Sequence, residues 1–282
     1  MPAFTAPDGT ELAYHLTGEG EPLLCLPGGP MRASAYLGDL GGLSRHRRLI
    51  RLDLRGTGAS GVPADPATYR CDRQVTDVEA LRAHLGIECV DLLAHSAGGD
   101  LALLYAARYP RRVRTLTLVT GRARALGVEF TEEHRREAAA LRKAEPWFVS
   151  ASESYERIWA GSGIDADWDA IAPFFYGRWD TAAQAHAATD VEQSNEEAAA
   201  LYASPDAFDP AGARAVVAGW DTRVLLLAGE LDGGPLPRVA AEIAGLFREA
   251  ETVVLPGAGH FPWLDDPRRF VATVTAFLDQ TR

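Results

Sequence analysis

Residues 90–110 read VDLLAHSAGGDLALLYAARYP, and this stretch decides the fold. Its apolar start is typical of a buried parallel strand, while apolar residues after Asp100 recur at helical spacing until Pro110. Between strand and helix lies a run of small residues around Ser96. A sharp strand-to-helix turn needs such small residues, and it presents the Ser96 hydroxyl at the sheet edge beside a helix N-terminus. The stretch therefore predicts a parallel α/β sheet carrying a nucleophilic serine.

Composition and charge narrow the range of functions. The 282 residues are 47% hydrophobic and 24% charged, which is typical of a globular protein. A net charge of −11 lacks the basic surface that nucleic acids or anionic membranes require. Cys25, Cys71 and Cys89 show no metal-ligand spacing, and no signal-peptide pattern or membrane-length apolar run occurs. We expect a cytoplasmic protein that acts on a small molecule without a cofactor or metal.

Strand and helix patterns alternate along the chain, which predicts a mostly parallel, doubly wound sheet covered on both faces. The first two strands are joined by the turn signal Asp8-Gly9 and are expected to be antiparallel. Besides the strand and helix of 90–110, the expected strands are 3–5, 11–16, 22–26, 48–53, 113–119, 223–228 and 252–255, and the expected helices are 34–43, 72–85, 237–247 and 267–278.

The alternation is interrupted over residues 121–220, where helical patterns occur without strand patterns. This segment contains 17 acidic and 9 basic residues, and five of the six tryptophans, of which Trp220 is its last residue. We expect a helical cap, or lid, inserted between two parts of an α/β core, residues 1–120 and 221–282. The alternative is that the acidic residues form a solvated surface while the tryptophans pack a small core of the segment's own. This alternative would account for most of these residues.

Two further polar residues follow strand ends. Asp232 follows the apolar run VLLLAG, and His260 follows the loop Pro-Gly-Ala-Gly after the next strand. Because carboxyl ends of parallel strands share one sheet edge, both should lie near Ser96. The chain order Ser, Asp, His matches a strand-turn-helix nucleophile with its acid and base. Separately, Asp232 could cap the next helix and His260 could be an ordinary loop histidine; together they predict a catalytic triad.

Acyl transfer to a serine also needs hydrogen-bond donors for the oxyanion. We expect the backbone N–H of Ala97, directly after the nucleophile, to supply one. The second should come from the Gly28-Gly29 turn, and Gly29 is favoured because Pro30 has no N–H.

Several residues near these motifs are expected to contact substrate. Gly28, His95 and Phe261 adjoin the predicted catalytic residues, and Trp179 lies in the cap. Glu192 and Glu196, also in the cap, are four residues apart, which would put them on one face of one helix. Such a face could bind an amine or cation, or it could be a solvated acidic surface.

Five motifs resemble the α/β-hydrolase-fold serine hydrolases, with the nearest likeness to the proline iminopeptidase-like branch: LPGGP at 26–30, LDLRGTGAS at 52–60, AHSAGG at 94–99, GELD at 229–232 and GAGHFPWLDDP at 257–267. That branch usually has His-Gly-Gly-Pro-Gly, where this chain has Pro27 and Met31 at the two ends, and Asp-Gln-Arg-Gly, where it has Leu54. The resemblance implies the fold and the triad. The lid glutamates that hold a substrate amine in that branch have no recognisable counterpart here.

These observations predict a hydrolase of esters, amides or lactones that works through an acyl-enzyme. Three alternatives use the same residues differently. One is a non-hydrolytic acyltransferase, cyclase or lyase, one is an aminopeptidase, and one is a small-molecule receptor that retains the triad.

Overall fold

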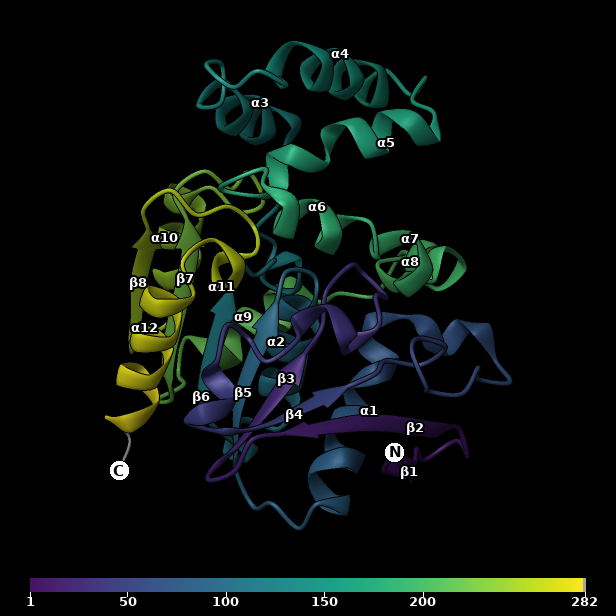
Figure 1. The fold of residues 1–282 in the computed structure, drawn as a ribbon. Helices are drawn as coiled ribbons and strands as arrows, with labels where there is room; N and C mark the ends of the chain where they lie inside the picture. The colour runs from purple at the N-terminus through teal and green to yellow at the C-terminus, as the bar shows by residue number, and fades with distance from the viewer. Residues whose placement is uncertain (281–282) are drawn as a thin grey trace.

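The computed structural model describes residues 1–280 and contains an eight-stranded sheet with helices on both faces (Figure 1). The strand order is β1-β2-β4-β3-β5-β6-β7-β8. The first three in this order pair antiparallel, and all later neighbours pair parallel, which confirms the predicted mostly parallel α/β sheet. The strands are β1 Ala3–Thr5, β2 Glu11–Thr17, β3 Pro22–Leu26, β4 Arg48–Leu52, β5 Val90–His95, β6 Val113–Val119, β7 Arg223–Gly229 and β8 Ala250–Leu255.

Twelve α-helices are described within residues 1–280, and seven of them, α3 to α9, lie between β6 and β7. Figure 1 shows α3, α4 and α5 standing apart from the sheet, beyond the carboxyl ends of its central strands. The helices are α1 Cys71–His84, α2 Gly98–Arg108, α3 Glu132–Ala140, α4 Phe148–Trp159, α5 Asp165–Ile171, α6 Thr181–Ala187, α7 Asp190–Gln193, α8 Glu196–Tyr202, α9 Pro210–Val217, α10 Pro237–Ala244, α11 Pro262–Asp265 and α12 Pro267–Asp279.

Two apolar clusters sandwich the sheet. Alternate residues of a strand point to opposite faces, so Leu24 and Leu26 of β3 join one cluster while Leu23 and Cys25 join the other. The first cluster includes side chains from α1, α2, α9 and α10, and the second includes side chains from α12. The residues of β3 are buried on both faces, which explains why the parallel strands read as continuous apolar runs.

The helices between β6 and β7 pack in two places. Tyr155, Ile171 and Phe174 belong to a small separate cluster, against which Trp147 and Trp159 pack. In contrast, the buried residues of α8 and α9 belong to the first cluster of the main core. The outer helices α3 to α5 therefore have a core of their own, while α8 and α9 are anchored on the sheet layer.

The helix expected over residues 34–43 is not formed. A single 3-10 turn, Ser34–Leu37, ends at Gly38 with a φ of 54°. Leu40 then has a φ of 51° and is fully buried in the second cluster. The three glycines of this stretch permit left-handed backbone that an α-helix does not allow, so the chain turns inward instead.

The loop after β4 is fixed by two buried charged residues. Asp53 accepts hydrogen bonds from the N–H and Oγ of Ser34 at 2.9 and 2.7 Å and from the N–H of Ala59 at 3.0 Å. Burial acts to raise the pKa of Asp53, but these bonds hold it below its usual value. Arg55 binds both carboxylate oxygens of Asp77 on α1, at 2.5 and 2.6 Å. Asp53 and Arg55 therefore brace the loops beneath the sheet edge.

The Arg55–Asp77 pair yields a prediction about stability. Arg55→Met should lower the free energy of unfolding by about 3–5 kcal/mol, because it leaves the buried Asp77 carboxylate without its partner. Urea denaturation measures this change. The control Arg73→Met removes an arginine that is 63% exposed and should change stability by less than about 0.5 kcal/mol. A loss below about 1 kcal/mol for Arg55→Met would contradict the assigned role.

Candidate active site

Ser96 occupies a strained turn between β5 and α2. Its φ is +51°, and its N–H donates to the carbonyl of Val119 at 3.1 Å. The surroundings have no room for larger residues: a Cβ added to Gly28 would lie 2.7 Å from the Cβ of Ser96, and one added to Gly98 would lie 2.5 Å from the carbonyl oxygen of Pro27. Such close approach explains the small residues on both sides of the serine.

Asp232 and His260 follow the carboxyl ends of β7 and β8 and are hydrogen-bonded to each other. The Nδ1–H of His260 donates to Oδ2 of Asp232 at 2.9 Å, and the N–H of Gly234 donates to Oδ1 at 2.9 Å. Asp232 is 1% exposed. With Nδ1 protonated, Nε2 of His260 carries a lone pair and can accept a proton.

A buried chain of hydrogen bonds connects the Gly28 turn to the backbone of His260. Nε2–H of His95 donates to the carbonyl of His260 at 2.9 Å, so Nδ1 of His95 accepts from the hydroxyl of Tyr36 at 2.7 Å. The Tyr36 oxygen in turn accepts the N–H of Gly28 at 2.7 Å. Burial, aided by the neighbouring His260, holds the pKa of His95 well below its usual value. His95 is therefore neutral and links the elements that carry Ser96 and His260.

The backbone N–H groups of the predicted oxyanion hole differ in whether another group already binds them. The N–H of Gly28 is used by Tyr36, whereas neither Gly29 nor Ala97 donates its N–H to another group within residues 1–280. Gly28 also brings this turn against Ala97, because its added Cβ would lie 3.2 Å from the Ala97 nitrogen. Two unused backbone donors thus adjoin Ser96 at the N-terminus of α2, where a developing negative charge is favoured.

Arg32 fixes the loop that carries Gly29 to the helices between β6 and β7. It is 4% exposed and bonds to Asp190 of α7 at 2.8 Å, Gln193 at 3.0 Å and Thr189 at 3.0 Å. Its guanidinium also lies 4.5 Å from the ring centroid of Tyr36. The α6–α7 segment therefore contributes to the position of the Gly28-Gly29 turn.

Two residues beside His260, Phe175 and Thr120, were not predicted from the sequence. The carbonyl of Phe175 accepts the N–H of His260 at 2.7 Å, and its ring, 37% exposed, lies 5.9 Å from the imidazole. The hydroxyl of Thr120, at the end of β6, donates to the His260 carbonyl at 2.9 Å. Neither stands in a motif, so only the three-dimensional arrangement identifies them.

Three residues expected to contact substrate lie in packed surroundings. Both ring nitrogens of His95 are bonded to protein groups, and Phe261, 8% exposed, stacks on Tyr176 at 4.9 Å. Trp179 is half-buried with its ring 5.4 Å from that of Tyr176. These contacts give His95 and Phe261 positioning roles beneath the site.

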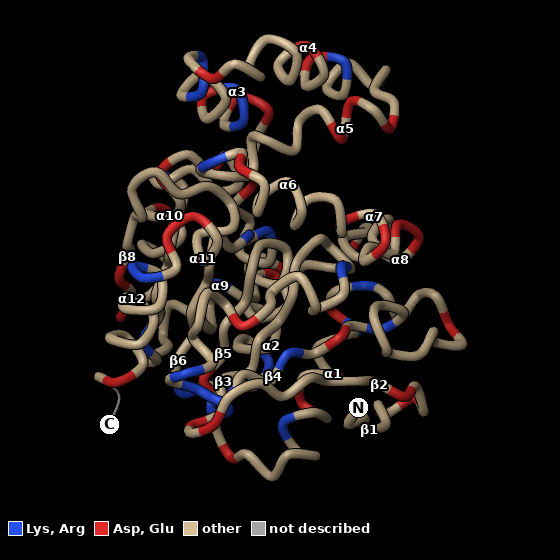
Figure 2. Tube along the Cα trace, in the orientation of Figure 1, with Lys and Arg blue, Asp and Glu red and all other residues tan. Residues whose placement is uncertain are grey.

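The expectation that Glu192 and Glu196 share a helix face is wrong. Glu192 belongs to α7 and Glu196 begins α8, with Ser194 and Asn195 extended between them. Asn195 breaks the helix because its N–H donates to the carbonyl of Met31 at 3.0 Å and its side chain caps α8. Both glutamates are exposed, in an acidic region of α7 and α8 (Figure 2). The acidic surface is the interpretation that this geometry favours.

Two further kinds of site are absent from residues 1–280. No group of three or more His, Cys, Asp or Glu side chains in this range is arranged to hold a metal ion. None of the helices there has both the length and the apolar character needed to cross a bilayer.

The close packing at Gly28 yields a second prediction. Gly28→Ala should lower the kcat/KM for a simple aryl ester by about 100-fold or more, because the added methyl group must push the Gly28-Gly29 turn away from Ser96. Steady-state kinetics tests this. Gly219→Ala is the matched control, since its added Cβ would meet only one atom, at 3.8 Å, and it should keep full activity. Unchanged kinetics in Gly28→Ala would show that the turn does not need this close approach.

Comparisons with known proteins agree with this fold. The sequence model of the alpha/beta hydrolase fold family matches residues 21–267. A proline iminopeptidase of Levilactobacillus brevis is 27% identical over 91% of this chain and 88% of its own length. The crystal structure of a proline iminopeptidase of Mycobacterium smegmatis has a TM-score of 0.77 at 24% identity, covering 99% of this chain and 98% of that one.

The same architecture occurs in enzymes with other substrates. An enol-lactonase from Burkholderia xenovorans has a TM-score of 0.70 at 24% identity, covering 99% of this chain and all of the other. At this identity the likeness shows the fold alone, whereas the family match extends over most of the sequence. The chain belongs to the α/β-hydrolase family, as a hydrolase similar to the proline iminopeptidases.

Proposed function

We propose that the protein is a serine hydrolase that cleaves an ester, amide or lactone of a small molecule through an acyl-enzyme intermediate. Ser96 is the nucleophile, His260 the general base and Asp232 the residue that orients it. The observation that carries this proposal is the 2.9 Å bond from His260 Nδ1 to Asp232, because an Nδ1–H donated to the carboxylate leaves Nε2 as the basic nitrogen. The ring centroid of His260 lies 4.8 Å from that of His95, the residue before Ser96.

In the first step His260 accepts the hydroxyl proton of Ser96 at Nε2 while Ser96 Oγ attacks the substrate carbonyl. The neutral serine is a weak nucleophile, so this transfer is needed at neutral pH. Asp232 stabilises the imidazolium that forms, and its own position is fixed by the N–H of Gly234.

The carbonyl oxygen becomes an oxyanion in this step. We assign the N–H groups of Gly29 and Ala97 to receive it, because neither bonds to another group within residues 1–280. Each such donor typically contributes about 3 kcal/mol to the transition state. Collapse of the tetrahedral intermediate passes the proton from His260 to the leaving group. Water, activated by His260, then hydrolyses the acyl ester on Ser96.

We further propose that residues 121–220 form a cap over this site. The support is the place of Phe175, whose carbonyl binds the His260 N–H and whose partly exposed ring lies beside the imidazole. Arg32 supplies a second link between the cap and the Gly28-Gly29 turn.

The aminopeptidase alternative loses its main support from this chain. Glu192 and Glu196, the only residues advanced for an amine subsite, are exposed and belong to separate helices. Acyl transfer instead of hydrolysis is distinguished by product analysis in water with and without added amine or thiol acceptors. A receptor without catalysis is excluded when aryl ester turnover depends on Ser96.

The proposed roles predict a specific pattern of kinetics. Ser96→Ala and His260→Ala should each lower kcat for an aryl ester by about 10⁴-fold or more, and the double variant should lose no more than either alone, because the residues act as one unit. Ser150→Ala, at an exposed serine of α4, is the control and should be fully active. A Ser96→Ala protein that retains more than about 1% of the wild-type kcat would overturn the proposal.

A further inference from the structure

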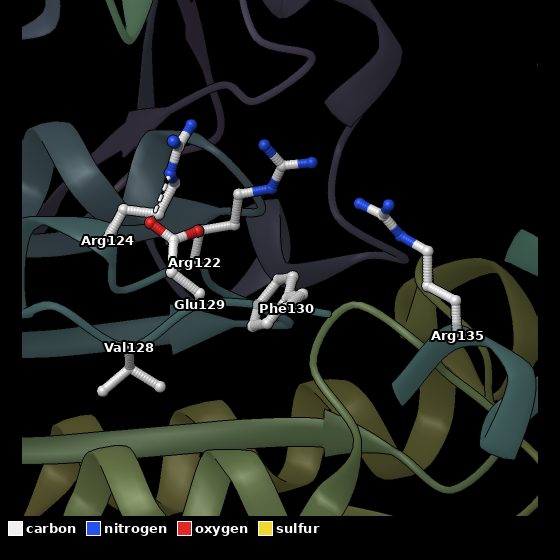
Figure 3. A pocket seen from close by; sticks show the side chains of 6 residues that line it. All are labelled: Arg122, Arg124, Val128, Glu129, Phe130 and Arg135. Carbon is white, nitrogen blue, oxygen red and sulfur yellow. Dashed lines mark hydrogen bonds and ion pairs between the residues drawn. The ribbon is translucent and has the colours of Figure 1, made fainter. Parts of the chain in front are cut away.

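A pocket rich in arginine lies beside the proposed catalytic residues. Its walls come from the segment after β6 and from α3 (Figure 3). We call it the arginine pocket, and it is lined by Arg122, Arg124, Val128, Glu129, Phe130 and Arg135. The surrounding segment 121–220 is strongly acidic, with 17 acidic against 9 basic residues, so this concentration of positive charge runs against its composition.

The arginine pocket is joined to both the nucleophile turn and the acid turn. The backbone N–H of Arg122 donates to the carbonyl of Ser96 at 2.9 Å. On the opposite side, a Cβ added to Gly234 would lie 3.6 Å from the ring of Phe130, and one added to Gly233 would lie 3.6 Å from the Cα of Arg135. The pocket therefore adjoins both the segment that carries Ser96 and the loop that carries Asp232.

Two of the three guanidinium groups have no counterion. Arg124 pairs with Glu129 at 3.0 Å. Within residues 1–280, the side chains of Arg122 and Arg135 form no ion pair or hydrogen bond. Figure 3 shows both groups extending past the ring of Phe130 toward the same space, and the guanidinium of Arg122 lies 5.9 Å from the centroid of that ring.

The electrostatic state of Arg122 is unfavourable without a ligand. Burial lowers its pKa, and the positive charges of Arg135 and Arg124 act in the same direction. Asp100 opposes this effect from α2, but its carboxylate binds the N–H of Ala125 at 2.9 Å and does not bond to the guanidinium. Even with Asp100 ionised, the three arginines of the pocket have only two carboxylates near them, those of Glu129 and Asp100. A bound anion would relieve this excess of positive charge.

We propose that Arg122 and Arg135 form a subsite for a carboxylate of the substrate, so that the natural substrate is an ester, lactone or amide bearing a free carboxylate away from the bond that is cleaved. This inference rests on the proposed function. Guanidinium groups suit the assignment because each can donate two parallel hydrogen bonds to a carboxylate. The apolar ring of Phe130 beside them would contact the carbon chain that joins the two functional groups.

A matched pair of substrates tests the subsite. The 4-nitrophenyl monoester of adipic acid carries a free carboxylate, and its methyl-capped diester does not. The wild-type protein should show the higher kcat/KM for the monoester. Arg122→Met and Arg135→Met should each reduce the ratio of the two kcat/KM values by about 10- to 100-fold, because each removes charge-assisted hydrogen bonds. Arg122→Lys, which keeps the charge but not the paired donors, should give an intermediate ratio.

The control variant is Arg136→Met, one residue further along α3. Its side chain is 48% exposed and bonds to Glu132 and Glu156, so the ratio should stay at the wild-type value. Inhibition of diester hydrolysis by adipate, with dimethyl adipate as the neutral counterpart, requires no variant. Adipate should compete and dimethyl adipate should not.

The outcomes separate this inference from the function on which it rests. Equal kcat/KM values for the two esters in the wild type, or a ratio that the methionine variants leave unchanged, overturns the carboxylate subsite while Ser96-dependent hydrolysis stands. Hydrolysis of the neutral diester that persists in Ser96→Ala overturns the proposed function itself. A monoester-to-diester ratio that falls in both methionine variants and stays at the wild-type value in Arg136→Met supports the subsite.

Discussion

The site depends on the left-handed backbone at Ser96. A non-glycine residue with a φ of +51° typically costs about 1–3 kcal/mol, so the conformation persists only where the surroundings enforce it. Here the N–H of Ser96 is held by Val119 of β6, and Gly28 and Gly98 close on the turn with no space for a side chain. The same packing that holds the serine in this conformation brings a second backbone segment against Ser96, and in that segment the Gly29 N–H bonds to no other group within residues 1–280.

Around this turn, elements far apart in sequence are connected through buried polar contacts. Tyr36 and His95 link the Gly28 turn to the His260 loop, and Arg32 links the same turn to α6 and α7. Buried hydrogen-bond networks of this kind are costly to disrupt, because a lost partner leaves a desolvated polar group. The relative positions of Ser96, His260 and the Gly28-Gly29 turn, to which we assign the catalytic roles, are therefore set by the core and by the helices inserted between β6 and β7.

The sequence was sufficient to predict the sheet, because its strands are continuous apolar runs. It also indicated the site, because Ser96, Asp232 and His260 each follow the end of such a run. It could not predict contacts between remote segments. Glu192 and Glu196 have helical spacing, but Asn195 pairs with Met31 far away in the chain and breaks the helix. Residues 34–43 also have a helical pattern, but the left-handed backbone of Gly38, Gly41 and Gly42 prevents an α-helix there. Arg122 and Arg135 are 13 positions apart and share no motif, so only the folded structure shows that they line one pocket with Phe130.

The central claim, covalent catalysis by Ser96, is tested most directly by a fluorophosphonate probe and intact-protein mass spectrometry. Such a probe forms a stable bond with an activated serine and mimics the charge of the tetrahedral intermediate. We predict one adduct per chain, mapped by proteolysis to the peptide containing Ser96, absent in Ser96→Ala and formed far more slowly in His260→Ala. An unlabelled wild-type protein, or an adduct that persists in Ser96→Ala, would contradict the account.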